Sequence, residues 1–116
     1  MTSDSTCIFC KIIAGDIPAN FVHRDEDVVA ITDVNPQAPQ HVLVMPVRHI
    51  PTFADFVGFE KPELITKVFS VAGQLSRELS ANGSRAVINT GPEGGQTVDH
   101  LHVHALAGRQ MHWPPG

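Results

Sequence analysis

The stretch HLHVHALA, residues 100–107, alternates histidine with apolar residues, and this alternation constrains the fold more than any other feature of the chain. In a β-strand, side chains at positions i, i+2 and i+4 lie on one face. A strand therefore places His100, His102 and His104 on a single face, with apolar residues packed behind them. On a helix the same histidines would point in different directions, so the pattern predicts a buried strand.

The rest of the sequence divides into short elements that are typical of an α+β domain. We expect strands over residues 21–25, 27–34, 41–47, 84–90 and 98–107, a short helix over 7–15 and a long amphipathic helix over 61–81. Apolar residues spaced three or four apart indicate the long helix, and Asn82 and Gly83 indicate its end. Because the strands mostly follow one another, the sequence predicts an antiparallel five-stranded meander sheet with one long and one short helix.

The composition restricts the classes of partner. The 116 residues are 42% hydrophobic, which suits one domain over residues 1–116. With 8 basic and 12 acidic residues the formal charge is −4, and no basic run could follow a phosphate backbone, so we expect no nucleic-acid partner. The N-terminal MTSDST is polar and no apolar run reaches the roughly 18 residues of a membrane span, so we expect no membrane partner and a cytoplasmic location.

Three histidines on one strand cannot easily converge on one metal ion. Same-face neighbours lie about 6.6 Å apart, so the outer two would be about 13 Å apart, whereas zinc ligands lie about 2.0 Å from the metal. Two of them with a ligand from elsewhere could bind a metal, and the third would then serve proton transfer or nucleophilic attack. The alternative is three structural histidines, which is the weaker interpretation for three in register beside a glycine-rich loop.

That loop, GPEGGQT at residues 91–97, carries groups that suit an anion. Gly94 and Gly95 leave backbone N–H groups accessible, and Gln96 and Thr97 add side-chain donors. Taken alone, the loop could equally be an ordinary turn between strands. Beside the histidines, it indicates the second half of a binding site.

Four stretches of the chain resemble the histidine triad (HIT) family of nucleotide hydrolases and transferases, in particular its Hint branch, the purine nucleoside phosphoramidases. The four stretches are CIFCKIIAGDIPA, DVNPQAPQHVLVMPVRHI, GPEGGQTVDHLHVHALAGR and GRQMHWPPG. They occur in the family's order and cover nearly the whole chain. The resemblance implies a HIT-like fold and a single HIT domain.

The resemblance implies roles in the reaction for three of the histidines. His102 is expected to be the nucleophile that attacks the α-phosphorus and forms a nucleotidyl-histidine intermediate, since imidazole is nucleophilic near neutral pH. His104 is expected to contact the phosphate and leaving group, and His41 to orient His102 or to join a proton relay. The hydroxyl of Thr97 and the N–H groups around Gly95 are expected to hold the phosphoryl oxygens.

The resemblance also implies a nucleotide-binding set. Asp33 is expected to accept the ribose hydroxyls, Asn89 to bind near the ribose and phosphate, and apolar side chains to form a slot for the purine. The full set is Ile31, Asp33, Val34, Leu43, Asn89, Gly95, Gln96, Thr97, His102 and His104. Asp99 departs from the family pattern, in which an aromatic or neutral residue is common, and this leaves the substrate preference open.

The only two cysteines, Cys7 and Cys10, are spaced C-x-x-C, which is typical of metal sites and of redox dithiols. By the resemblance they bind a structural zinc together with His49 and His100, and no organic cofactor is expected. A closed Cys₂His₂ set has no open position for substrate. One histidine of the three would thus serve the metal and two the chemistry.

The resemblance implies a function and an assembly. We expect hydrolysis of nucleoside 5′-phosphoramidates to a nucleoside monophosphate and an amine. Alternatives are hydrolysis of dinucleoside polyphosphates, or a nucleotide-binding scaffold in which turnover is incidental. The ending WPPG resembles that of homodimeric relatives whose C-terminal segments cross near the partner's active site, so we expect a homodimer in which Trp113 shapes the leaving-group side.

Overall fold

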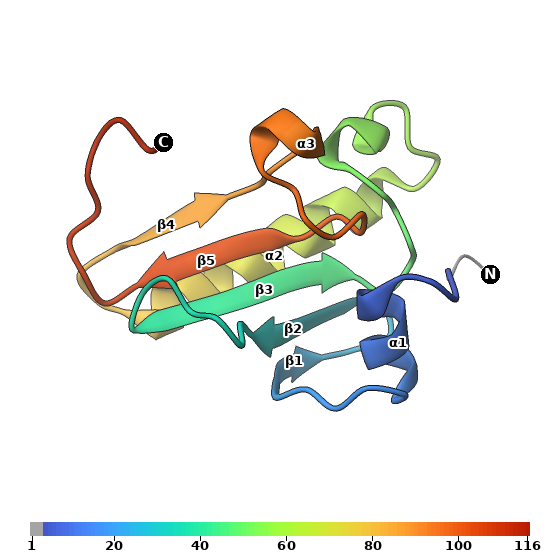
Figure 1. Cartoon of the computed structure of the whole chain (residues 1–116), viewed down its shortest axis with the longest axis horizontal. Coiled ribbons are helices and arrows are strands. Elements are labelled where there is room, and N and C mark those ends of the chain that lie inside the picture. Colours follow the sequence, from blue (N-terminus) through green and yellow to red (C-terminus); the bar gives the residue numbers. More distant parts are fainter. Residues whose placement is uncertain (1–3) are drawn as a thin grey trace.

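The computed structural model describes residues 4–116, which form an antiparallel sheet with a helix on each face (Figure 1). The strands are β1 (Phe21–Arg24), β2 (Val28–Thr32), β3 (Gln40–Pro46), β4 (Ser84–Val87) and β5 (Val103–Ala107). Their spatial order is β1-β2-β3-β5-β4, and all neighbours pair antiparallel. The α+β class and the five-stranded antiparallel sheet are thus confirmed. The meander is interrupted once, because β5 returns between β3 and β4.

The helices are α1 (Ile8–Ala14), the 3₁₀ turn η1 (Phe53–Phe56), α2 (Pro62–Leu79) and the single turn α3 (Gly91–Gly94). The short and the long helix lie where the sequence predicts them, and α1 ends at Gly15 with φ at 90°. The two short turns were not expected. Gly95, with φ at 86°, closes α3 within the expected loop.

Two apolar clusters hold the sheet between α1 and α2. Along β3, side chains alternate, so that Val42 and Val44 pack with Val68 of α2. Leu43 and Met45 face the other way and pack with Phe9 of α1. His41 of β3 and His104 of β5 share the Leu43 face, because Leu43 pairs with His104 and His41 pairs with Leu106.

The predicted strand over residues 98–107 is wrong in its first half, since β5 begins only at Val103. Beyond this point the opposite strand reaches Pro46, which has no N–H to donate. The carbonyl of Pro46 is instead bonded by the imidazole Nε2 of His100 at 2.8 Å, and the N–H of Leu101 donates to Ile50 at 2.6 Å. A side chain therefore replaces the ladder here, and only His104 of the three histidines lies in a strand.

Strand β4 is likewise shorter than predicted and ends at Val87. Across the described residues 4–116, none of the helices combines the length and the apolar character that crossing a bilayer requires.

Candidate functional site

An open groove of about 420 Å³ lies on the sheet face that carries His41 and His104. Its lining residues are Asp33, Asn35, Gln37, His41, Val87, Asn89, Thr97, His104 and Leu106. Five residues that the sequence analysis assigned to nucleotide binding or catalysis therefore meet there, from segments far apart in the chain. A larger hollow of about 650 Å³ near the start of α2 is lined mostly by charged side chains, among them the ion pairs Arg48–Glu60 at 2.8 Å and Lys67–Asp27 at 2.9 Å, and its lining contains no histidine or cysteine.

His41 and His104 form a bonded pair at the floor of the groove. The Nε2 of His41 lies 2.9 Å from the Nδ1 of His104, and the backbone N–H of Gln37 donates to the Nδ1 of His41 at 3.0 Å. A carboxylate oxygen of Asp33 lies 3.4 Å from the same Nε2 of His41. His41 is thus hydrogen-bonded at both ring nitrogens, and the imidazole that it contacts is that of His104.

His102 is buried beside the groove with its Nδ1 2.7 Å from the carbonyl oxygen of His100. Because a carbonyl can only accept, Nδ1 carries the proton and the lone pair of Nε2 is left free. The ring lies edge-on to Phe9 at 5.1 Å between centroids and 4.9 Å from the ring of His104. The sequence analysis missed Phe9 as a site residue, and its position between the two cysteines on the buried side of α1 is the signal that could have found it.

Burial favours the neutral forms of His102 and His104. It lowers the pKa of His102, against opposing effects from the hydrogen bond to His100 and the charge of Asp33. Burial, followed by repulsion from His102 and His41, lowers the pKa of His104 to about 4. Near neutral pH, His102 therefore has the uncharged form that a nucleophile needs.

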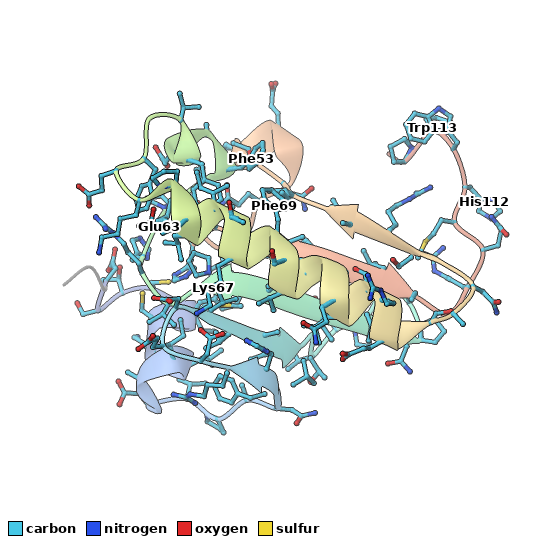
Figure 2. All side chains as sticks on the ribbon, turned by 180° about the vertical axis from the view of Figure 1, so that it is seen from behind. Phe53, Glu63, Lys67, Phe69, His112 and Trp113 are labelled. Atoms are coloured by element: carbon cyan, nitrogen blue, oxygen red, sulfur yellow. The ribbon has the colours of Figure 1, made fainter. Side chains whose placement is uncertain are left out.

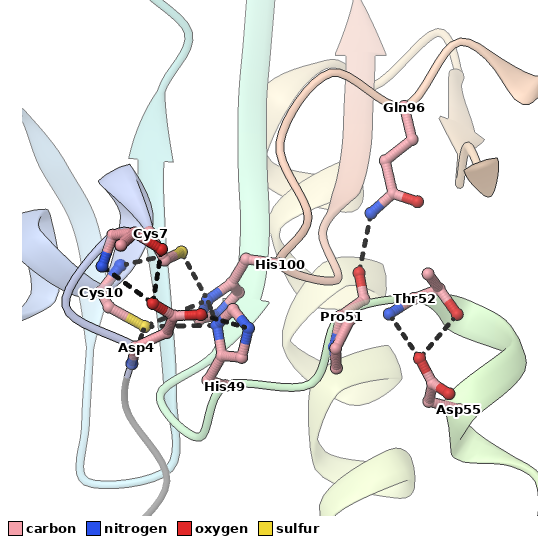
Figure 3. Close-up of polar contacts among 10 residues, drawn as sticks. Asp4, Cys7, Cys10, His49, Pro51, Thr52, Asp55, Gln96 and His100 are labelled. Atoms are coloured by element: carbon pink, nitrogen blue, oxygen red, sulfur yellow. Dashed lines mark hydrogen bonds and ion pairs between the residues drawn. The ribbon is translucent and has the colours of Figure 1, made fainter. Parts of the chain in front are cut away.

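A second cluster brings together Cys7, Cys10, His49 and His100, whose ligand atoms all lie within 4.8 Å of one another (Figure 3). The Nδ1 of His100 is 3.4 Å from the sulfur of Cys7, 3.6 Å from that of Cys10 and 3.3 Å from the Nδ1 of His49. Tetrahedral ligands at zinc–nitrogen and zinc–sulfur bond lengths would be separated by about 3.3–3.8 Å. The geometry therefore fits a tetrahedral metal ion.

The protonation pattern of this cluster also fits a metal. His100 donates its Nε2–H to the Pro46 carbonyl, which leaves Nδ1 unprotonated toward the sulfurs, as in metal-bound histidines. Burial lowers the pKa of His100 to about 4, so that it stays neutral. Burial also raises the pKa of the Cys10 thiol, so that Cys10 holds its proton until a cation displaces it.

Several predicted binding residues have other environments. Ile31 and Leu43 are buried against the α1 cluster, whereas Val34 is 98% exposed, and none of the three lines the groove. The amide nitrogen of Gln96 donates to the carbonyl of Pro51 (Figure 3). It also donates to the carbonyl of Val98, and the amide oxygen accepts from the N–H of Gly91. Gln96 therefore braces α3 against the chain before η1. Gly95 ends α3, next to the groove residue Thr97.

The chain is similar to several known proteins. Residues 14–111 match the family model of the HIT domain. The chain is 44% identical to a 14 kDa zinc-binding protein of Zea mays, over 97% of this chain and 90% of that protein. It is 41% identical to the adenylylsulfatase HINT1 of Arabidopsis thaliana, over 98% of this chain and 79% of that protein.

A solved structure is similar to this chain in both sequence and fold. The crystal structure of a HIT family hydrolase from Legionella pneumophila superposes with a TM-score of 0.89 at 46% identity, and the match covers 95% of this chain and 99% of that one. The residues that match the family model include all five strands of the sheet, the residues that line the groove, and His100, His102 and His104. This chain belongs to the HIT domain family.

Proposed function

We propose that this chain hydrolyses nucleoside 5′-phosphoramidates to a nucleoside monophosphate and an amine, with His102 as the nucleophile. The observation that carries the proposal is the hydrogen bond from the Nδ1 of His102 to the His100 carbonyl at 2.7 Å. This bond fixes one tautomer and leaves the Nε2 lone pair available for attack. The groove beside it contains the donors and the carboxylate that a nucleotide needs.

The reaction proceeds in two displacements at phosphorus. The Nε2 of His102 attacks the α-phosphorus, the P–N bond breaks, and the departing nitrogen takes up one proton from solvent in the open groove. Water then attacks the phosphorus, the P–N bond to His102 breaks, and the ring returns to its neutral form. Over the whole cycle, the oxygen of one water molecule joins the phosphorus and its two protons leave with the amine as an ammonium ion.

The groove residues bind and orient the substrate in this proposal. His104 and Thr97 donate to the phosphoryl oxygens as charge redistributes over them. Asn89 lies at the ribose and phosphate, and Asp33 accepts from the ribose hydroxyls. Since Ile31 and Leu43 are buried and Val34 is exposed, we place the purine at the outer rim beside Val34.

A second candidate reaction is the hydrolysis of an adenylyl sulfate. The Arabidopsis relative is named an adenylylsulfatase. The same nucleotidyl-histidine would form, and only the leaving group would differ, being sulfate in place of an amine. Dinucleoside polyphosphates would react through this intermediate as well, with a nucleotide as leaving group.

We further propose that Cys7, Cys10, His49 and His100 bind one structural zinc ion. The maize relative is named a zinc-binding protein, and the distances and donor types of the cluster suit that ion. When bound, the ion would tie α1 to the segment that carries His102 and leave no position for substrate. Two cysteines held as metal ligands suit a reducing compartment such as the cytoplasm.

We also propose that the chain forms a homodimer through the C-terminal segment. Figure 2 shows Trp113 and His112 on a segment that extends beyond the sheet, and Trp113 is 82% exposed. A tryptophan placed in this way has a large apolar surface available to a second copy of the chain. In that dimer it would reach the leaving-group side of the partner's groove.

The test compares AMP release from adenosine 5′-phosphoramidate, adenosine 5′-phosphosulfate and a diadenosine polyphosphate. The matched control for His102→Ala is His23→Gln, because His23 lies on β1, away from the groove, and bonds Asp25. We expect the phosphoramidate to be the best substrate, His102→Ala to lose turnover and adenylylated-protein mass, and His23→Gln to retain both. Turnover that persists in His102→Ala would refute the nucleophile, and a faster reaction of another substrate would refute the phosphoramidase assignment.

A further inference from the structure

The proton of His41 is fixed by a backbone group. The N–H of Gln37 donates to the Nδ1 of His41 at 3.0 Å. A peptide N–H cannot act as an acceptor, so Nδ1 must be unprotonated and the ring proton of His41 lies on Nε2. His41 is therefore held in one of its two neutral tautomers.

This tautomer determines that of His104. The protonated Nε2 of His41 lies 2.9 Å from the Nδ1 of His104, so that Nδ1 must accept. A neutral His104 then carries its proton on Nε2. A doubly protonated His104 would direct its Nδ1–H at the Nε2–H of His41, and this conflict disfavours the charged form in addition to burial.

The backbone of Gln37 is itself held, at its carbonyl, by the segment that follows β5. The Nε of Arg109 donates to the carbonyl of Gln37 at 3.0 Å. Arg109 reaches it through Gly108, where φ is +98° and an added Cβ would lie 2.9 Å from the Cβ of Pro39. Only glycine permits this close approach. Arg109 and His104 thus belong to one continuous segment, which holds the loop of residues 35–40 through a hydrogen bond to Gln37 and a close contact with Pro39.

The same hydrogen bond argues against a metal in the groove. Asp33, His41 and His104 lie close enough together to be considered as metal ligands. A histidine that binds a metal through Nε2 must carry its proton on Nδ1. The Nδ1 of His41 is already occupied by a donor, the N–H of Gln37.

We propose that Arg109 and the backbone of Gln37 are positioning groups that lock the His41–His104 pair in one tautomer, so that His104 meets the phosphate as a neutral N–H donor and not as an acid. The role toward phosphate rests on the proposed function, whereas the tautomer does not. A neutral donor stabilises charge on the phosphoryl oxygens but cannot supply the proton of the leaving group.

The test reads the tautomers directly, from long-range proton–nitrogen NMR spectra of the full chain labelled with nitrogen-15 histidine, without substrate. We expect a protonated Nε2 and an unprotonated Nδ1 on both His41 and His104 near neutral pH. Arg109→Ala should give mixed tautomers at His41, and Arg109→Lys should restore the wild-type pattern, because lysine can still donate to the Gln37 carbonyl. Arg85→Ala is the matched control, because the guanidinium of Arg85 likewise donates to one backbone carbonyl, that of His112 at 2.9 Å, and not to Gln37.

Activity supplies a second measurement. The loss of one hydrogen bond of this kind should lower kcat of Arg109→Ala by about two- to tenfold, with KM nearly unchanged. A protonated Nδ1 on wild-type His41 would overturn the proposal, as would an Arg109→Ala spectrum identical to the wild-type spectrum. If the tautomers are as expected but phosphoramidates are not hydrolysed, the tautomer lock stands and only the proposed function fails.

Discussion

Replacing Phe9 with leucine should lower activity more than its effect on stability accounts for. Phe9 is 7% exposed and lies edge-on to two imidazoles, His100 at 5.9 Å and His102 at 5.1 Å between ring centroids. Each edge-to-face contact contributes about 0.5–1.5 kcal/mol beyond burial. We therefore expect Phe9→Leu to lose about 1–3 kcal/mol of unfolding free energy and to free the ring of His102.

The chain offers a closely matched control in Phe56. This side chain is also 7% exposed and also has two edge-on aromatic partners, Phe53 at 6.4 Å and Phe59 at 6.1 Å. It belongs to the apolar cluster on the α2 face and contacts no residue of the groove. Phe56→Leu should therefore lose a similar 1–3 kcal/mol, which is roughly 4–12 °C in Tm for a chain of this size.

The two variants should separate in turnover. A contact of about 0.5–1.5 kcal/mol that orients the nucleophile corresponds to a loss of about two- to twelvefold in kcat. We expect this loss in Phe9→Leu and an unchanged kcat in Phe56→Leu, measured well below both melting temperatures by AMP release. Equal losses in both variants would show that turnover follows general stability and would refute a positioning role for Phe9.

Three further outcomes follow from the polar clusters. If the proposed zinc is structural, a strong chelator should lower Tm while the initial rate of turnover persists. Cys10→Ser should bind less than one zinc per chain by elemental analysis. Immediate loss of turnover on chelation would instead place the metal in the reaction. Burial alone would raise the pKa of Asp25, but hydrogen bonds from His23, from two backbone N–H groups and from Lys67 hold it well below its usual range. This stabilisation is present above the unfolded pKa and is lost as the pH falls through the folded one, so Asp25→Asn should cost about 1 kcal/mol at pH 7 and less in acid, by denaturant unfolding. The pKa of His104 is lowered to about 4, so wild-type stability should fall as the pH drops from about 6.5 toward 4, and His104→Asn should show a smaller fall; identical pH profiles would contradict this.

The helices α1 and α2 could be predicted because their sequence patterns lie within the helices themselves or directly beside them. The spacing of apolar residues located α2 to within two residues at each end, and the glycine after Ala14 marked the end of α1. The position of β5 between β3 and β4 is a long-range choice that no local pattern encodes. The single turn α3 depends on positive φ at Gly91 and Gly95, which a glycine permits but does not require.

The resemblance to the HIT family predicted residues that the structure brings together. Asp33, His41, Asn89, Thr97 and His104 meet in one groove, and Cys7, Cys10, His49 and His100 meet in one cluster. The groups that orient them could not be predicted, because they are backbone atoms. The N–H of Gln37 and the carbonyl of His100 are present at every residue of a chain, and only the fold selects these two.

The irregularity before β5 has a chemical consequence for the nucleophile. A strand continued through residue 100 would commit the backbone groups of this segment to the β3 ladder. Because the ladder stops at Val103, the carbonyl of His100 is free to accept from the Nδ1 of His102, while the ring of His100 lies among the cysteines. His100 thus joins the Cys/His cluster through its side chain and sets the tautomer of His102, the proposed nucleophile, through its backbone carbonyl. We therefore expect that a distortion of the cluster of Cys7, Cys10, His49 and His100 changes the tautomer of His102 before it disturbs the hydrogen bonds of the sheet.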